Sequence, residues 1–284
     1  LDVELGDVRD PVVVRRAVRG VDRVFHFAAQ VAVTTSLIDP LDDFRVNTEG
    51  TLRLLEALRG TRTPFLFTST NKVYGSLPDV ALTRVADRWV PDDLDGISEA
   101  RPLCFCTPYG CSKGAADQYV LDYARSFGLP AVVFRMSCIY GPHQHGNEDQ
   151  GWVAHFLLSA LRGDPVVIYG DGAQVRDILF VDDLVDAMLA VTARADVLAG
   201  EAFNVGGGPD NTISLMELLD LIDEVHGSRP FVEFGAERPG DQRYYVSDTR
   251  KLGRAIAWKP RVGVAEGVGA LYEWLSSARA AAAA

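Results

Sequence analysis

Tyr109 and Lys113 lie four residues apart in a segment that begins a predicted helix. This spacing places the phenol and the ammonium on the same helix face. A neighbouring cation can lower the phenol pKa from its usual value of about 10, so that the phenolate takes a proton from an alcohol near neutral pH. By itself the pair is weak evidence, because an aromatic residue packed against the core beside a solvated lysine has the same spacing.

Three hydroxyl residues, Thr68, Ser69 and Thr70, follow an apolar run that predicts a strand. In an open parallel sheet, the carboxyl ends of the strands border the crevice where ligands bind. Hydroxyl groups at that edge are natural hydrogen-bond donors to a substrate oxygen. Thr70, Tyr109 and Lys113 together therefore indicate a site that oxidises an alcohol by hydride transfer.

The elements that must position these residues alternate between short apolar runs and longer segments of helical period. This alternation predicts an α/β fold with a doubly wound parallel sheet. We predict strands at residues 3–5, 23–27, 64–68 and 131–136, helices at residues 11–18, 39–58 and 108–127, and a polar loop up to about residue 106.

Beyond residue 140, frequent glycine and proline residues divide the chain into shorter elements. We predict helices at residues 152–161, 181–193, 214–226 and 264–277, with strands near Val166, Ile178, Phe203 and Phe231. Ser214 and Glu217 have the spacing of a capping box. Residues 1–140 are thus predicted to form the main α/β domain, and residues 141–284 mainly a smaller mixed substrate-binding region.

The composition is that of a soluble globular enzyme, with 48% hydrophobic and 24% charged residues among 284. The net charge of −11 argues against binding to nucleic acid or to an acidic membrane surface, and an anionic ligand must be met by a local cluster of arginines. Four clustered cysteines favour a reducing cytoplasm. We expect no metal, because Cys104, Cys106 and Cys111 lack a nearby histidine.

Motifs in order along the chain resemble the extended short-chain dehydrogenase/reductase family, the NAD-dependent epimerases and dehydratases of nucleotide sugars. The resemblance is carried by residues 67–75, by Tyr109 to Lys113, by Arg135 with residues 140–142, and by residues 169–177. It implies a Rossmann-like fold, NAD as the cofactor and a nucleotide-diphosphate sugar as the substrate.

The same resemblance implies roles for individual residues. Tyr109 would be the base, Lys113 its electrostatic partner and a ligand of the nicotinamide ribose, and Thr70 would hold the sugar oxygen. The implied NAD-binding residues are Asp7, Val8, Phe27, Ala28, Ala29, Gln30, Asn47, Tyr109, Lys113 and Met136. The implied substrate-binding residues are Asn71, Gln150, Trp152, Arg176 and Arg243. The two arginines would meet the diphosphate, although each would also fit a structural ion pair.

Within the family, residues 30–36, 69–75, 108–123, 149–153 and 241–243 most resemble epimerases that invert C2 of a CDP-linked sugar. A UDP-sugar 4-epimerase is the nearest alternative. A 4,6-dehydratase is less favoured, because Asn71 and Lys72 stand where such enzymes usually carry an acid pair. A non-catalytic NAD sensor is the remaining alternative.

Two further expectations follow from the resemblance. The glycine-rich phosphate loop of the family has no counterpart in this sequence, so we expect the chain to begin at the third strand of the family fold and to bind NAD poorly. Homodimers are common in the family, and the implied contact is a helix pair within residues 39–58 and 109–127.

Overall fold

A four-stranded parallel sheet lies at the centre of the larger region of the molecule. The computed structural model describes residues 2–283, with side chains through residue 280. The strands β1 (Val24–His26), β2 (Phe65–Thr70), β5 (Ala131–Met136) and β9 (Ala202–Val205) are ordered β1-β2-β5-β9, and every pairing is parallel. All six residues of β2 are buried, as expected of a strand covered on both faces. The predicted parallel sheet is confirmed.

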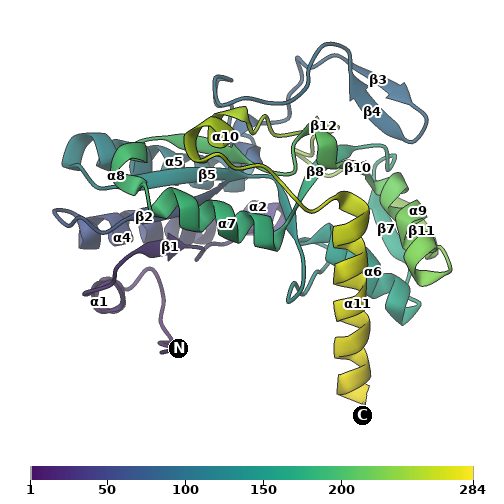
Figure 1. The fold of residues 1–284 in the computed structure, drawn as a ribbon, viewed down its shortest axis with the longest axis horizontal. Coiled ribbons are helices and arrows are strands. Elements are labelled where there is room, and N and C mark those ends of the chain that lie inside the picture. The colour runs from purple at the N-terminus through teal and green to yellow at the C-terminus, as the bar shows by residue number, and fades with distance from the viewer. Residues whose placement is uncertain (1, 284) are drawn as a thin grey trace.

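Helices cover both faces of this sheet (Figure 1). On one face, α1 (Pro11–Ala17), α4 (Gly50–Leu58) and α5 (Thr107–Phe127) share a core with Phe65 and Phe67 of β2. On the other face, α7 (Val181–Thr192), α8 (Ala195–Leu198) and α10 (Arg250–Ile256) pack around Leu66. Successive β2 side chains thus enter opposite cores, which confirms the doubly wound arrangement.

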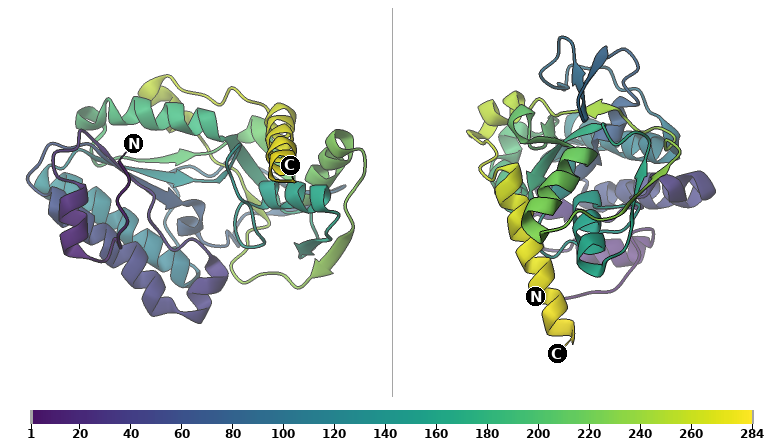
Figure 2. Two further views of the ribbon diagram at one scale, coloured as in Figure 1. Left: turned by 90° about the horizontal axis from the view of Figure 1, so that it is seen from below. Right: turned by 90° about the vertical axis from the view of Figure 1, so that its right-hand side faces the viewer.

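The second region is built around smaller mixed sheets. Strand β8 (Val175–Phe180) pairs in parallel with β6 (Cys138–Tyr140) and β12 (Tyr244–Tyr245), and antiparallel with β10 (Thr212–Ser214). A second sheet joins β7 (Val166–Tyr169) to β11 (Val232–Gly235) in parallel. Helices α6 (Trp152–Arg162), α9 (Leu215–His226) and α11 (Val264–Ala283) enclose its core, and α11 extends away from the rest of the molecule (Figure 2). The predicted capping box at Ser214 and Glu217 is confirmed.

The predicted helix over residues 39–58 is confirmed as a continuous helical segment with an irregular centre. It consists of α3 (Pro40–Phe44), the π-helical turn η1 (Arg45–Glu49) and α4. The carboxylate of Asp39 caps its start by accepting the Asp42 N–H at 3.0 Å. A short helix that the sequence did not predict, α2 (Val33–Ile38), precedes it.

Three sequence-based expectations are corrected. The predicted strand at residues 3–5 is absent, because these residues find no partner strand within the described part of the chain, and Val3 and Leu5 are 81% and 91% exposed. The predicted polar loop contains a short 3-10 helix, η2 (Asn71–Tyr74), and a hairpin of β3 (Leu82–Val85) and β4 (Arg88–Pro91). This hairpin lies at the surface. Its strands therefore need no apolar face, and the sequence shows no apolar alternation that would predict them.

The third correction concerns how the chain is shared between the regions. Strand β9 pairs with β5 in the first sheet, and α7, α8 and α10 cover that sheet, although all four elements follow residue 140. A division at residue 140 is therefore too simple for these segments. Within residues 2–283, no helix combines the length and the apolar character needed to cross a membrane.

Candidate active site

A cavity of about 460 Å³ lies where the carboxyl ends of β2 and β5 meet the second region. Because β2 continues through Thr70, which pairs with Met136 of β5, the hydroxyl residues end at this edge as predicted. Seven of the residues implied by the resemblance line the cavity: Thr70, Asn71, Tyr109, Met136, Gln150, Trp152 and Arg176. The site is thus assembled from both regions of the molecule.

Thr70 and Tyr109 approach each other at the wall of this cavity. Thr70 ends β2, and Tyr109 lies in the first turn of α5, where its backbone N–H donates to Ser36 Oγ at 3.2 Å. Burial raises the pKa of Tyr109 to about 12, although a hydrogen bond with the Thr70 side chain opposes this shift. The phenol therefore carries its proton at neutral pH and lies beside the threonine hydroxyl.

Lys113 lies one helical turn further along α5, but its ammonium points at the sheet. Its Nζ donates to the carbonyl oxygen of Thr68 at 2.6 Å and lies 4.2 Å from the centroid of the Phe67 ring. Burial lowers the pKa of Lys113 to about 7, against the opposing effects of Asp117 and Asp43. The expectation that this ammonium lowers the Tyr109 pKa is wrong for this structure, because the strand carbonyl takes the ammonium and burial dominates the phenol.

A buried ion pair between α5 and β5 lies next to the strand residues that precede Thr70. Asp117 of α5 is fully buried and accepts from Arg135 of β5 at 2.9 and 3.0 Å. The same carboxylate accepts from Ser69 Oγ at 2.9 Å. Arg135 also donates to the hydroxyl of Tyr74 at 3.1 Å. These contacts tie α5, β2 and β5 together directly beside Thr70 and Lys113.

The residues implied to bind NAD lie mostly outside the cavity. Buried Asn47 accepts the Gln30 N–H at 2.9 Å, and its amide donates to the Gln30 carbonyl at 3.0 Å, so it fixes the segment that follows β1. Phe27, directly after β1, is 57% exposed. Ala28 is exposed, whereas Ala29 and Gln30 are half-buried. Asp7 is exposed and paired with Arg9, and Val8 packs against Gly50.

The polar groups at this edge fit the hydroxyl-rich ribose of NAD. The buried Lys113 ammonium has one hydrogen-bond acceptor among the described residues, although an ammonium has three donors. Oxygen Oδ2 of Asp43 is buried and has no hydrogen-bond partner in the described part of the chain. A ribose diol would supply both the missing acceptor and the missing donor.

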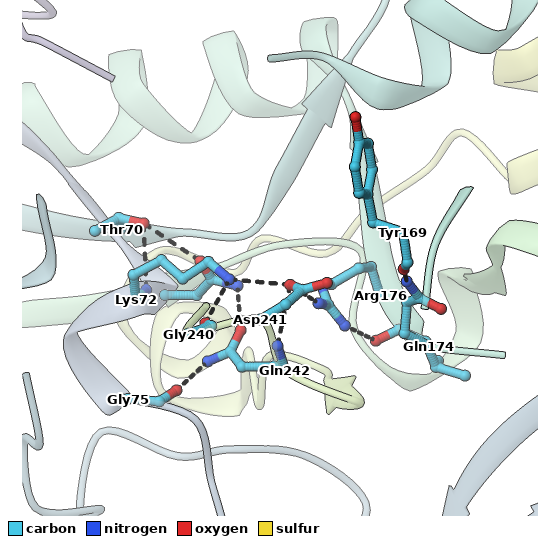
Figure 3. Close-up of polar contacts among 11 residues, drawn as sticks. Thr70, Lys72, Gly75, Tyr169, Gln174, Arg176, Gly240, Asp241 and Gln242 are labelled. Atoms are coloured by element: carbon cyan, nitrogen blue, oxygen red, sulfur yellow. Dashed lines mark hydrogen bonds and ion pairs between the residues drawn. The ribbon is translucent and has the colours of Figure 1, made fainter. Parts of the chain in front are cut away.

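A cluster of charges that lines the same cavity was only partly predicted. Arg176 donates to Asp241 at 2.7 Å, and Lys72 donates to the same carboxylate oxygen at 3.2 Å (Figure 3). Arg238, another cation of the cavity wall, stacks over Tyr169 at 3.9 Å. The sequence analysis missed Lys72 and Asp241 as site residues, although both lie inside motifs that it quoted.

Arg243 is the implied substrate residue that the structure places elsewhere. Its guanidinium pairs with Glu237 at 3.3 Å, lies over the Trp89 ring at 5.2 Å and is 59% exposed. It does not line the cavity. A direct contact with a ligand there would require its side chain to leave both partners.

Comparisons with known proteins agree with this geometry. Residues 2–206 match the model of the NAD dependent epimerase/dehydratase family. The chain belongs to this family. It is 42% identical to CDP-paratose 2-epimerase from Salmonella typhi, over 96% of this chain and 83% of that protein. It is 32% identical to dTDP-glucose 4,6-dehydratase 1 from Escherichia coli K12, over 90% of this chain and 73% of that protein.

A solved structure shows the same fold. The UDP-glucose 4-epimerase of Thermus thermophilus in complex with NAD superposes with a TM-score of 0.80 at 33% identity, over 96% of this chain and 84% of that chain. These findings confirm the expected family, its Rossmann-like fold and NAD as its cofactor. They also confirm the resemblance to the CDP-sugar 2-epimerases.

Proposed function

We propose that this protein is an NAD-dependent epimerase of the CDP-paratose 2-epimerase type, acting on C2 of a CDP-linked hexose. The observation that carries the proposal is that Thr70 and Tyr109 line one cavity, which two regions of the molecule enclose. The 42% identity to CDP-paratose 2-epimerase supports this substrate class.

In this proposal, Tyr109 and Thr70 act on the same sugar hydroxyl. Tyr109 takes the proton of the sugar hydroxyl through its phenol oxygen, and Thr70 holds that sugar oxygen by a hydrogen bond. NAD, when bound, accepts the hydride and returns it to the opposite face of the resulting ketone. Tyr109 then gives the proton back, so the net reaction changes configuration and not oxidation state. Arg176 faces the diphosphate, and Asn71, Gln150 and Trp152 surround the sugar.

The raised pKa of the Tyr109 phenol constrains this mechanism. A group with a pKa of about 12 is a weak acid that must lose its proton before it acts as a base near neutral pH. The Lys113 ammonium, one helical turn further along α5, donates to the Thr68 carbonyl oxygen. We propose that Lys113 binds the nicotinamide ribose through its remaining N–H donors.

Two alternatives belong to the same family. A UDP-sugar 4-epimerase would use the same Thr70 and Tyr109 on another carbon. A 4,6-dehydratase needs an acid to protonate the leaving hydroxyl, and the residues after Thr70 are an amide and an ammonium, Asn71 and Lys72. The residues at the cavity therefore favour an epimerase.

The experiment that tests the proposal is incubation of the NAD-loaded protein with CDP-paratose, CDP-glucose and UDP-glucose, followed by NMR of the sugar ring. We expect inversion at C2 of CDP-paratose without net release of NADH. Inversion at C4 of UDP-glucose would instead assign the 4-epimerase activity, and a 4-keto-6-deoxy product would assign a dehydratase. Binding of NAD without any turnover would favour a sensor.

We also propose a homodimer in the cytoplasm. Helices α3 and α5 are in contact, and each exposes large apolar side chains: Leu41 at 65% and Phe44 at 50% on α3, and Tyr119 at 43% on α5. Exposed apolar side chains that lie together mark interaction surfaces more often than single scattered ones do. The four cysteines are free, which suits a reducing compartment.

A further inference from the structure

The ammonium of Lys72 lies near Thr70 at the cavity and has a hydrogen-bond donor without an acceptor among the described residues. Its Nζ donates to the carbonyl oxygen of Gly240 and to Asp241 Oδ1, each at 3.2 Å. An ammonium has three donors, and the described residues accept from two of them. Lys72 lines the cavity two positions after Thr70. One N–H of Lys72 is therefore left for a ligand.

Asp241 offers the complementary group at the same place. Its Oδ1 accepts from Lys72, from Arg176 at 2.7 Å and from the Gln242 N–H at 3.0 Å, whereas no donor in residues 2–283 reaches Oδ2. Burial by itself would raise the pKa of Asp241. The positive charges of Arg176 and Lys72 outweigh this effect and lower the pKa to about 2. The group is a carboxylate at any working pH, so Oδ2 only accepts hydrogen bonds.

The backbone holds this donor and acceptor in fixed positions. The Lys72 N–H donates to Thr70 Oγ1 at 3.2 Å, which fixes the turn from β2 into η2. The Gln242 amide donates to the Gly75 carbonyl at 2.6 Å and thereby joins the loop that carries Asp241 to the end of η2 (Figure 3). Groups fixed in this way lose little entropy when a ligand binds.

We propose that Lys72 and Asp241 form a subsite that recognises one non-reacting hydroxyl of the hexose. A hydroxyl donates one hydrogen bond and accepts others, so it satisfies the free N–H of Lys72 and Oδ2 of Asp241 together. A phosphate would meet the negative carboxylate, and a carbonyl would leave Oδ2 unpaired. The closeness of Lys72 to Thr70 places the subsite at the sugar, away from the nucleotide base.

This inference rests on the proposed function, because it requires a nucleotide-linked hexose in the cavity. It adds a specificity rule to it. A sugar that lacks the recognised hydroxyl leaves the free N–H of Lys72 and Oδ2 of Asp241 without this partner in the occupied cavity, which costs binding. Lys72 and Asp241 thus select among hexoses that would react equally well at Thr70 and Tyr109.

The test combines protein variants with sugar analogues in calorimetric titrations of the NAD-loaded protein. The probes are CDP-glucose, its analogues that lack one hydroxyl at C2, C3, C4 or C6, and CDP itself. We expect Lys72→Met to weaken CDP-glucose binding about tenfold or more. One deoxy analogue should bind the wild type and Lys72→Met with the same affinity, and CDP binding should not change. Asp241→Asn should single out the same analogue.

Two controls keep the result specific. Lys251→Met removes another ion-paired lysine, one that pairs with Glu201 at 2.7 Å outside the cavity, and should leave all titrations unchanged. Lys72→Arg keeps the charge and donors and should restore part of the lost affinity. An equal loss for every ligand, CDP included, or no loss for CDP-glucose, would overturn the subsite.

The titrations need no turnover, so they separate this inference from the proposed function. A protein that binds CDP-glucose and shows the predicted selectivity, but inverts no sugar carbon, would contradict the epimerase and keep the subsite. A protein that inverts C2 but shows the same preference among deoxy analogues before and after Lys72→Met would support the epimerase and contradict the subsite.

Discussion

At the scale of single residues, burial outweighs neighbouring charges in setting the pKa values of Tyr109 and Lys113. Tyr109 and Lys113 are both buried. Burial raises the pKa of the phenol and lowers the pKa of the ammonium, because it favours the uncharged form of each group. The helix spacing predicted that both side chains would share one face of the helix. It did not reveal that the Thr68 carbonyl takes the ammonium, because that contact depends on how α5 packs against β2.

Tyr109→Phe should lower kcat by about 10²- to 10⁴-fold, because it removes the only oxygen proposed to take the sugar proton. Its effect on folding should be small, since the ring stays in place. The measurement is turnover of CDP-paratose by NMR, with a thermal melt of the same sample. Turnover near that of the wild type would end the mechanism proposed above.

Lys113 should make stability depend on pH in protein without added NAD. Its pKa is about 7 when folded and about 10.4 in an unfolded chain, so the unfolded state binds more protons between these values. Stability should therefore rise with pH above 7, by up to about 1.4 kcal/mol per unit, and the penalty should be complete below 7.

Urea unfolding at pH 7, 8 and 9 checks this expectation. Lys113→Met should flatten the rise, whereas Lys259→Met, which removes an exposed lysine, should keep it. The same slope in the wild type and in Lys113→Met would show that the ammonium is not penalised by its surroundings.

At the scale of elements, one buried ion pair aligns the strands and the helix of the site. Asp117 and Arg135 join α5 to β5, and Ser69 adds β2 to the same network. The three elements joined by this network, β2, β5 and α5, were predictable from their apolar pattern. The surface hairpin β3–β4 was not, because half-exposed strands show no apolar alternation.

Asp117→Asn should lower the free energy of unfolding by about 3 kcal/mol or more, because it leaves the Arg135 charge buried without its counter-ion. Urea denaturation measures this change. The matched control is Asp122→Asn on the exposed side of the same helix, which should shift stability by less than about 0.5 kcal/mol. Equal effects of the two variants would remove the special role of Asp117.

At the scale of the whole molecule, the sequence does not reveal that β9, α7, α8 and α10, which follow residue 140, pack on the first sheet. A strand such as β9 has the same apolar character in either region, so its partner is decided by tertiary packing. The charged wall of the cavity was equally hidden. Lys72 and Asp241 are 169 positions apart, and only the fold brings them together.

The proposed dimer predicts that Phe44→Glu yields a monomer, because a charge would enter the apolar contact between α3 and α5 of two copies. Sedimentation equilibrium gives the mass directly. Phe231→Glu is the control, since Phe231 is 71% exposed in the other region. A monomeric wild type, or a dimer that survives Phe44→Glu, would exclude this contact.

The return of β9 to the first sheet also affects how the protein could be cut or recombined. A fragment that ended at residue 140 would leave β5 without its outer neighbour and would uncover Leu66, Val132 and Phe134, which α7, α8 and α10 normally shield. The second half would carry that strand and those helices with nothing to pack on. We therefore expect neither half to fold as an independent module, so a recombined enzyme should keep the two halves together.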